Sequence, residues 1–145
     1  MPNFGVIATK RWIATITLAS TAFCAFAQQS LEVIWSWKRL HECSTTSPEL
    51  RVSGVPPDAR VVDVKMVDLN FRQFDHGGGS VPISEHGAVI VPQGALKNYR
   101  GPCPGRNVYF GNDYEITVVA LGADGKTVLA QGSAVRTYGH RVVKE

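Results

Sequence analysis

The stretch YEITVVALGADGKTVLAQGSAVRTY, from Tyr114 to Tyr138, carries the clearest structural signal in this 145-residue chain. In its first part, every second residue falls on one apolar face: Tyr114, Ile116, Val118 and Ala120. This period of two is typical of a β-strand, in which successive side chains point to opposite faces. The Asp124-Gly125 pair that follows is a strong hairpin signal. We therefore predict an antiparallel hairpin whose return strand runs from Thr127 to Tyr138.

Other segments of the chain show the same alternation or a short apolar run. The apolar positions are Leu31, Val33, Trp35 and Trp37, then Leu50 and Val52, then Val62, Val64 and Met66, and finally Ala88 to Val91. Turn-rich segments such as SGVPPDAR separate them. No stretch keeps a helical period, and there is no internal repeat. The sequence predicts one all-β domain, mainly antiparallel, folded as a β-sandwich with few or no helices.

Residues 1–27 have the features of a cleaved secretory signal peptide. Basic residues at positions 10 and 11 precede an uncharged apolar run, Trp12 to Phe23, and Ala25-Phe26-Ala27 fits the small-x-small cleavage pattern. The run is short for a membrane span, although an uncleaved anchor is the alternative. We expect a mature domain of residues 28–145 without a membrane span, exported to the periplasm or secreted.

The mature domain is nearly neutral. Of the chain's 15 Lys and Arg residues, two lie in the N-terminal segment, whereas all 12 Asp and Glu residues lie outside it. The basic residues that remain are scattered rather than clustered. We therefore expect no nucleic-acid partner.

Two cysteines remain in the mature domain, Cys43 and Cys103. An even number of cysteines in an exported chain predicts a disulfide, and two free thiols are the alternative. No second cysteine or histidine lies at zinc-ligand spacing from either residue. We expect neither a metal site nor a cofactor.

The register of the strand around Val64 makes Asp68 notable. Continuing the face of Val62, Val64 and Met66 places Asp68 on the core side, with Asn70 following. A carboxylate that points inward must be paired, hydrogen-bonded or at the edge of a cavity. Alternatively, the strand ends at Val67 and Asp68 caps a turn.

The segment FDHGGGSV, from Phe74 to Val81, allows two interpretations. Three consecutive glycines are typical of a mobile surface loop. They also allow backbone amides to approach a ligand and form a concavity for an anion. His76 is then the group that faces the ligand. Because neither a nucleophile pattern nor a metal set accompanies these residues, we do not expect an enzyme.

Short segments in a particular order form a further pattern: SPEL (Ser47–Leu50), SGVP (Ser53–Pro56), VKMVDLN (Val64–Asn70), FDHGGG (Phe74–Gly79), YRGPCP (Tyr99–Pro104) and YEITVVALGADG (Tyr114–Gly125). In this order, the chain resembles the phosphatidylethanolamine-binding protein family and its bacterial Raf-kinase-inhibitor-like members. The resemblance implies a Greek-key β-sandwich with a small pocket that accepts phosphate-like head groups.

The resemblance also implies which residues line the pocket. Asp68 and His76 match the family's first aspartate and following histidine, and Tyr99, Gly101 and Pro102 match its glycine-proline loop. Leu69 and Asn70 stand where the family has Pro and Asp, and Gly77 replaces an aromatic residue.

Two functions follow as hypotheses. The first is an exported binding protein whose polar pocket holds a small anion or a phospholipid head group, through backbone amides and a protonated His76. Anion affinity should then weaken as the pH rises and the imidazole loses its proton. The second is a module that binds a protein partner through a long loop from Asn70 to Gly87, its pocket being vestigial.

Overall fold

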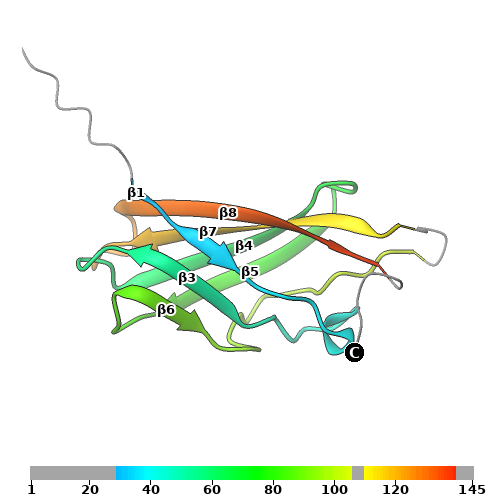
Figure 1. Cartoon of the computed structure of the whole chain (residues 1–145), viewed down its shortest axis with the longest axis horizontal. Helices are drawn as coiled ribbons and strands as arrows, with labels where there is room; N and C mark the ends of the chain where they lie inside the picture. Colours follow the sequence, from blue (N-terminus) through cyan, green and yellow to red (C-terminus); the bar gives the residue numbers. More distant parts are fainter. Residues whose placement is uncertain (1–28, 106–109, 140–145) are drawn as a thin grey trace, which may run out of the picture.

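The computed structural model describes residues 29–105 and 110–139. In this part of the chain, eight strands form two facing sheets, and there is one short 3₁₀ helix (Figure 1). The elements, in order, are β1 (Gln29–Ser30), β2 (Glu32–Ile34), η1 (Arg39–His41), β3 (Leu50–Val55), β4 (Val61–Asp68), β5 (Asp75–Pro82), β6 (Gly87–Val91), β7 (Asn112–Leu121) and β8 (Val128–Tyr138). The all-β prediction is confirmed. The signal peptide predicted for residues 1–27 lies outside the described residues.

The hairpin predicted from Tyr114 to Tyr138 is present as β7 and β8. Its turn is stabilised by Asp124, whose Oδ1 accepts the backbone N–H groups of Lys126 and Thr127, both at 2.9 Å. Gly125 follows at φ +64°, a conformation that glycine adopts without steric cost. The larger sheet has the strand order β1-β8-β7-β4-β5, so β4 and β7 are neighbours although β5 and β6 separate them in sequence.

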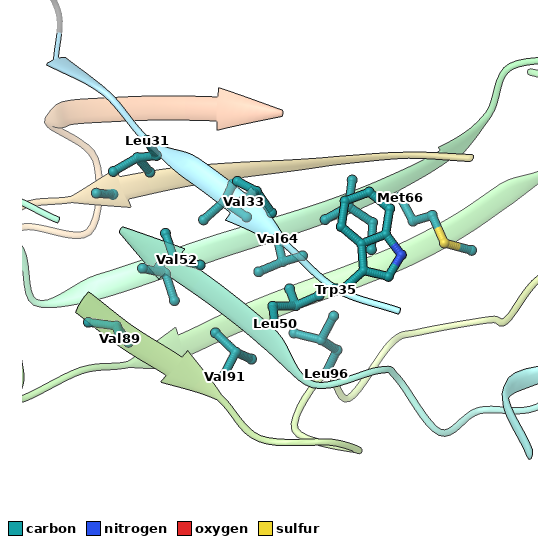
Figure 2. Close-up of a cluster of buried hydrophobic side chains, with 14 of the residues drawn as sticks. Leu31, Val33, Trp35, Leu50, Val52, Val64, Met66, Val89, Val91 and Leu96 are labelled. Carbon is teal, nitrogen blue, oxygen red and sulfur yellow. The ribbon is translucent and has the colours of Figure 1, made fainter. Parts of the chain in front are cut away.

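The smaller sheet, in the order β2-β3-β6, packs its apolar face against the larger one. Figure 2 shows side chains from both sheets meeting in one cluster, with Leu50, Val52, Val89 and Val91 from the smaller sheet and Val64 and Met66 from the larger. The apolar faces predicted from alternation are the buried faces of β4 and β7. The core therefore lies between the two sheets.

The N-terminal segment passes from one sheet to the other. β1 pairs in parallel with β8, the Leu31 N–H donates to the Gln131 carbonyl at 2.9 Å, and β2 then pairs antiparallel with β3. A Cβ on Gly132 would lie 2.0 Å from the Leu31 carbonyl oxygen, so this approach requires glycine. The parallel pair was not predicted, because alternation along one strand does not identify its partner.

The segment FDHGGGSV corrects the loop interpretation, since residues 75–82 form strand β5. Its glycines allow backbone to approach on both sides: a Cβ on Gly77 or Gly78 would lie 1.8 Å from the carbonyl oxygen of Asn98 or Val64, respectively. Gly78 and Asn98 exchange two backbone hydrogen bonds, and the Arg100 N–H donates to the His76 carbonyl. The prediction of a long loop from Asn70 to Gly87 is therefore wrong for the eight residues of β5.

The predicted disulfide is present between Cys43 and Cys103, whose Cα atoms are 4.6 Å apart. It joins the turn after η1 to the segment before β7. The Cys43 N–H donates to the Pro102 carbonyl, and the Gly101 N–H donates to the Ser44 carbonyl. Among residues 29–105 and 110–139, no helix is long and apolar enough to cross a membrane.

Candidate functional site

Asp68 is the last residue of β4 and lies inside the molecule, with 4% of its surface exposed. Its Oδ1 accepts the N–H groups of Asn70 at 2.8 Å and Phe71 at 2.9 Å, and its Oδ2 accepts the Asn112 side-chain amide at 2.7 Å. The inward direction predicted from the register is confirmed. Asp68 also caps the turn after β4, so both interpretations of this residue hold together.

Asn70 does not continue the buried face, because the strand has already ended. It is exposed, and its Oδ1 accepts the Asp113 N–H at 2.7 Å. The Leu69 N–H donates to the Asp113 carbonyl at 2.8 Å. These bonds hold the turn after β4 against the start of β7.

His76 is buried in β5, with 3% of its surface exposed. Its Nδ1 lies 2.8 Å from the Arg100 carbonyl oxygen. Because a carbonyl only accepts, Nδ1 carries a proton, and Nε2 is the acceptor of the neutral ring. The ring packs edge-on against Phe74 and Tyr114, with centroid distances of 4.7 and 5.3 Å. The surrounding structure therefore fixes the ring orientation.

Tyr114 was predicted only as a core residue, yet it lies directly opposite Asp68 in the β4–β7 register. Its hydroxyl is buried and makes no hydrogen bond of good geometry with any described residue. Burial raises the pKa of Tyr114, and the nearby Asp68 charge raises it further. The hydroxyl is therefore a proton donor at neutral pH.

A cavity of about 580 Å³ opens between these side chains. At its polar end lie Asp68, Asn70, His76, Asn112 and Tyr114. The remaining wall is mostly apolar and contains Phe71, Phe74, Cys103, Pro104 and Gly105. Phe71 is 54% exposed and Phe74 is 40% exposed, so both side chains also face solvent. The cavity thus combines a polar end with aromatic side chains open to solvent.

Three of the predicted site residues do not line this cavity: Tyr99, Gly101 and Pro102. Tyr99 is buried in the core, where its hydroxyl lies 3.5 Å from the Met66 sulfur and burial raises its pKa. Gly101 and Pro102 are also buried, and a Cβ on Gly101 would lie 2.1 Å from the His41 carbonyl oxygen. The structure thus brings together Asp68, Asn70 and His76 in one cavity, whereas Tyr99, Gly101 and Pro102 are not part of its lining.

The backbone amides proposed to hold an anion are already hydrogen-bonded. The Gly77 N–H donates to the Asp75 carboxylate, and the Gly78 N–H donates to the Asn98 carbonyl. The amides of Arg100 and Gly101 are also bonded to carbonyl oxygens. The glycine run therefore serves strand packing rather than an anion-binding concavity.

The charge that remains in the cavity is that of Asp68. No cation pairs with this carboxylate among the described residues, and its three partners are neutral donors. In the same part of the chain, no group of three or more His, Cys, Asp or Glu side chains could hold a metal ion. The polar end therefore offers an anionic acceptor beside an imidazole and a phenol.

No protein-family model matches the chain, and no curated protein matches it either. The resemblance to the phosphatidylethanolamine-binding protein family therefore stays a prediction.

Proposed function

We propose that the protein is an exported binding protein whose Asp68 cavity takes a small ligand with an amine or hydroxyl group, as in a phospholipid head group. The observation that carries the proposal is the buried, hydrogen-bonded Asp68 carboxylate, which has no ion-pair partner among the described residues. A buried charge without a counter-charge is costly, so a cationic or hydrogen-bond-donating ligand would be favoured there.

Asp68 has the capacity for such a contact. A carboxylate offers about four acceptor positions. Three are used, by Asn70, Phe71 and Asn112. The Tyr114 hydroxyl also lies close to this carboxylate, and a ligand ammonium group would add a charged donor and neutralise the charge.

The aromatic walls favour the same class of ligand. Phe71, Phe74 and Tyr114 line the cavity close to the carboxylate. A cation near aromatic faces is attracted by the ring quadrupole, typically by about 0.5–2 kcal/mol. The methylene groups of an ethanolamine-like ligand would pack against Phe71 and Phe74.

A phosphate on the same ligand would find fewer partners. The nearby backbone amides are engaged, which leaves His76, Asn112 and Tyr114 as side-chain donors. The His76 Nε2 donates only when the ring is protonated, since Nδ1 already faces the Arg100 carbonyl. We therefore expect phosphoethanolamine to bind no more tightly than ethanolamine, because its phosphate adds little to the contact that the amine makes.

Titration calorimetry with ethanolamine, phosphoethanolamine and inorganic phosphate tests the proposal. We expect both amines to bind the wild type, and Asp68→Asn to weaken ethanolamine binding by about tenfold, the effect of one charge-assisted bond. The matched control is Asp63→Asn, on the same strand, because Asp63 bonds to Ser80 and does not line the cavity. Equal affinities in the two variants, or no heat with either amine, would contradict the proposal.

The exposed phenylalanines favour a second candidate function, the binding of a protein partner at the cavity mouth. Phe71 and Phe74 are both large and solvent-exposed, as hydrophobic interface residues often are. For this function, Phe71→Ser should abolish partner binding, whereas Asp68→Asn should leave it unchanged. Chemical cross-linking of the partner to the wild type and to each of the two variants distinguishes the two functions.

A further inference from the structure

Asp68 and His76 lie on neighbouring strands and face the same side of the large sheet. Val67 on β4 pairs with Asp75 on β5, and the residue that follows on each strand is buried. Because the strands run antiparallel, Asp68 and His76 are diagonal neighbours across the pair, a relation in which residues are about 7–8 Å apart. Both side chains line the Asp68 cavity. One small ligand can therefore contact both of them.

The His76 ring offers this ligand an acceptor. Its Nδ1 donates to the Arg100 carbonyl at 2.8 Å, so the free lone pair of the neutral ring is on Nε2. Nε2 has no hydrogen-bond partner among the described residues, and these residues do not enclose it, whereas they do enclose the Tyr114 hydroxyl. Polar atoms of buried side chains are usually hydrogen-bonded. A donor from the cavity would complete the hydrogen bonding of His76.

The surrounding residues hold this acceptor in place. Arg100 makes two bonds to His76, since its carbonyl accepts from Nδ1 and its N–H donates to the His76 carbonyl, both at 2.8 Å. The rings of Phe74 and Tyr114 pack edge-on against the imidazole. A ligand therefore meets an acceptor whose orientation is already set, which lowers the entropic cost of the contact.

The other polar side chains of the cavity do not supply the missing donor. The Asn112 amide group donates to Asp68 at 2.7 Å, and the Tyr114 hydroxyl also lies close to this carboxylate. Asn70 is exposed, and its Oδ1 accepts the Asp113 N–H. The polar end thus offers a ligand two separate acceptors, a carboxylate and an imidazole nitrogen. A ligand that satisfies both must carry two donor groups.

We infer that the Asp68 cavity binds a small amino alcohol, whose ammonium group donates to Asp68 and whose free hydroxyl group donates to the His76 Nε2. The ammonium contact rests on the proposed function, and the hydroxyl contact is new. An ester oxygen has no proton to donate, so His76 makes the cavity select a free amino alcohol over the same group esterified to phosphate. His76 is thus the residue that determines this specificity.

Titration calorimetry at pH 8 with ethanolamine, ethylamine and 2-methoxyethylamine tests the inference. The last two keep the ammonium group but lack the hydroxyl proton. One of them is smaller than ethanolamine and the other is larger, so a size effect would not weaken both. We expect ethanolamine to bind about fivefold more tightly than either, the effect of one neutral hydrogen bond. Equal affinities would overturn this inference and leave the amine site standing. No binding by any of the three would overturn the proposed function as well.

The His76→Asn variant identifies the acceptor. An asparagine amide can still donate to the Arg100 carbonyl, but it places no acceptor at the position of Nε2. We expect the preference for ethanolamine over ethylamine to disappear in this variant. His86→Asn is the matched control, because His86 is exposed and does not line the cavity, so the preference should remain. A preference that survives His76→Asn would overturn the inference.

A measurement on the wild type alone decides the matter if His76→Asn does not fold. The ¹⁵N chemical shift of the unprotonated His76 Nε2 reports directly on a hydrogen bond to that atom. We expect this signal to move during titration with ethanolamine and to stay in place with ethylamine. Equal movement with both amines would show that the hydroxyl group does not contact His76, and would overturn the inference.

Discussion

His41 makes the stability of the protein depend on pH. Its ring is buried and its pKa lies below the ordinary value of 6.5, so the folded protein favours the neutral ring. In the unfolded chain, the His41 ring takes up a proton more readily. The contribution of His41 to the free energy of unfolding is therefore fully present above pH 6.5 and is lost as the pH falls through the lowered pKa. This direction follows from burial rather than from an ion pair.

The His41→Asn variant tests this pH dependence, because an asparagine side chain can still accept the Lys38 N–H. We expect the melting temperature of the wild type to exceed that of the variant by more at pH 7.5 than at pH 5. The measurement is thermal unfolding at several pH values in a phosphate-free buffer. A difference that stays constant with pH would mean that His41 stabilises only by packing.

Asp124 lies at an exposed hairpin turn, whereas His41 is buried. Even so, the contribution of Asp124 to stability, like that of His41, is lost as the pH falls. Hydrogen bonds from Thr127 and Lys126 lower its pKa from 3.8 to about 2. Its contribution is therefore present above pH 3.8 and is lost as the pH falls through about 2. Asp124→Ala should lower the melting temperature at pH 6, and the difference from the wild type should shrink toward pH 2. A difference of the same size at both pH values would contradict this account.

Strand β5 depends on its glycines because backbone lies close on both sides of it. At Gly78, φ is +154° and a Cβ would lie 1.8 Å from the Val64 carbonyl oxygen. We expect Gly78→Ala to destabilise the protein by about 2–4 kcal/mol. Gly87→Ala is the control, since Gly87 has φ +76° but no atom within 4 Å of the added Cβ. It should cost about 1 kcal/mol, for the backbone conformation alone. Urea unfolding of the two variants measures the difference, and equal costs would show that crowding is unimportant.

The same strand shows which elements a sequence pattern can predict. The strands β4 and β7 were predicted because alternating apolar residues record which face is buried. Three consecutive glycines have no side chains, so they show no alternation of apolar and polar residues. Strand β5 forms because the backbone around Val64 and Asn98 pairs with it. Strand β1 was missed for a related reason, since its pairing with β8 depends on a distant glycine, Gly132.

The Asp68 cavity was predictable in part. The register of β4 directed Asp68 inward, and the resemblance added His76. Tyr114 was missed because the alternation of β7 predicts its buried face but not its register with β4, which places Tyr114 opposite Asp68. Tyr99 was assigned to the site from the resemblance alone, whereas its ring belongs to the core.

The disulfide connects distant parts of the whole molecule, since Cys43 and Cys103 are 60 positions apart. In the chain-entropy model, closing a loop of that length stabilises the fold by about 4 kcal/mol. The double variant Cys43→Ser, Cys103→Ser should therefore unfold at lower denaturant concentration, as should the wild type treated with a reductant. If reduction leaves the unfolding midpoint unchanged, the cross-link contributes nothing to stability.

The passage of the N-terminal segment between the sheets has a consequence for the time order of folding. Gln29 and Ser30 pair with Ala130 and Gln131, near the opposite end of the described chain. A ribosome makes the first pair long before the second, so the large sheet cannot be completed until synthesis is nearly over.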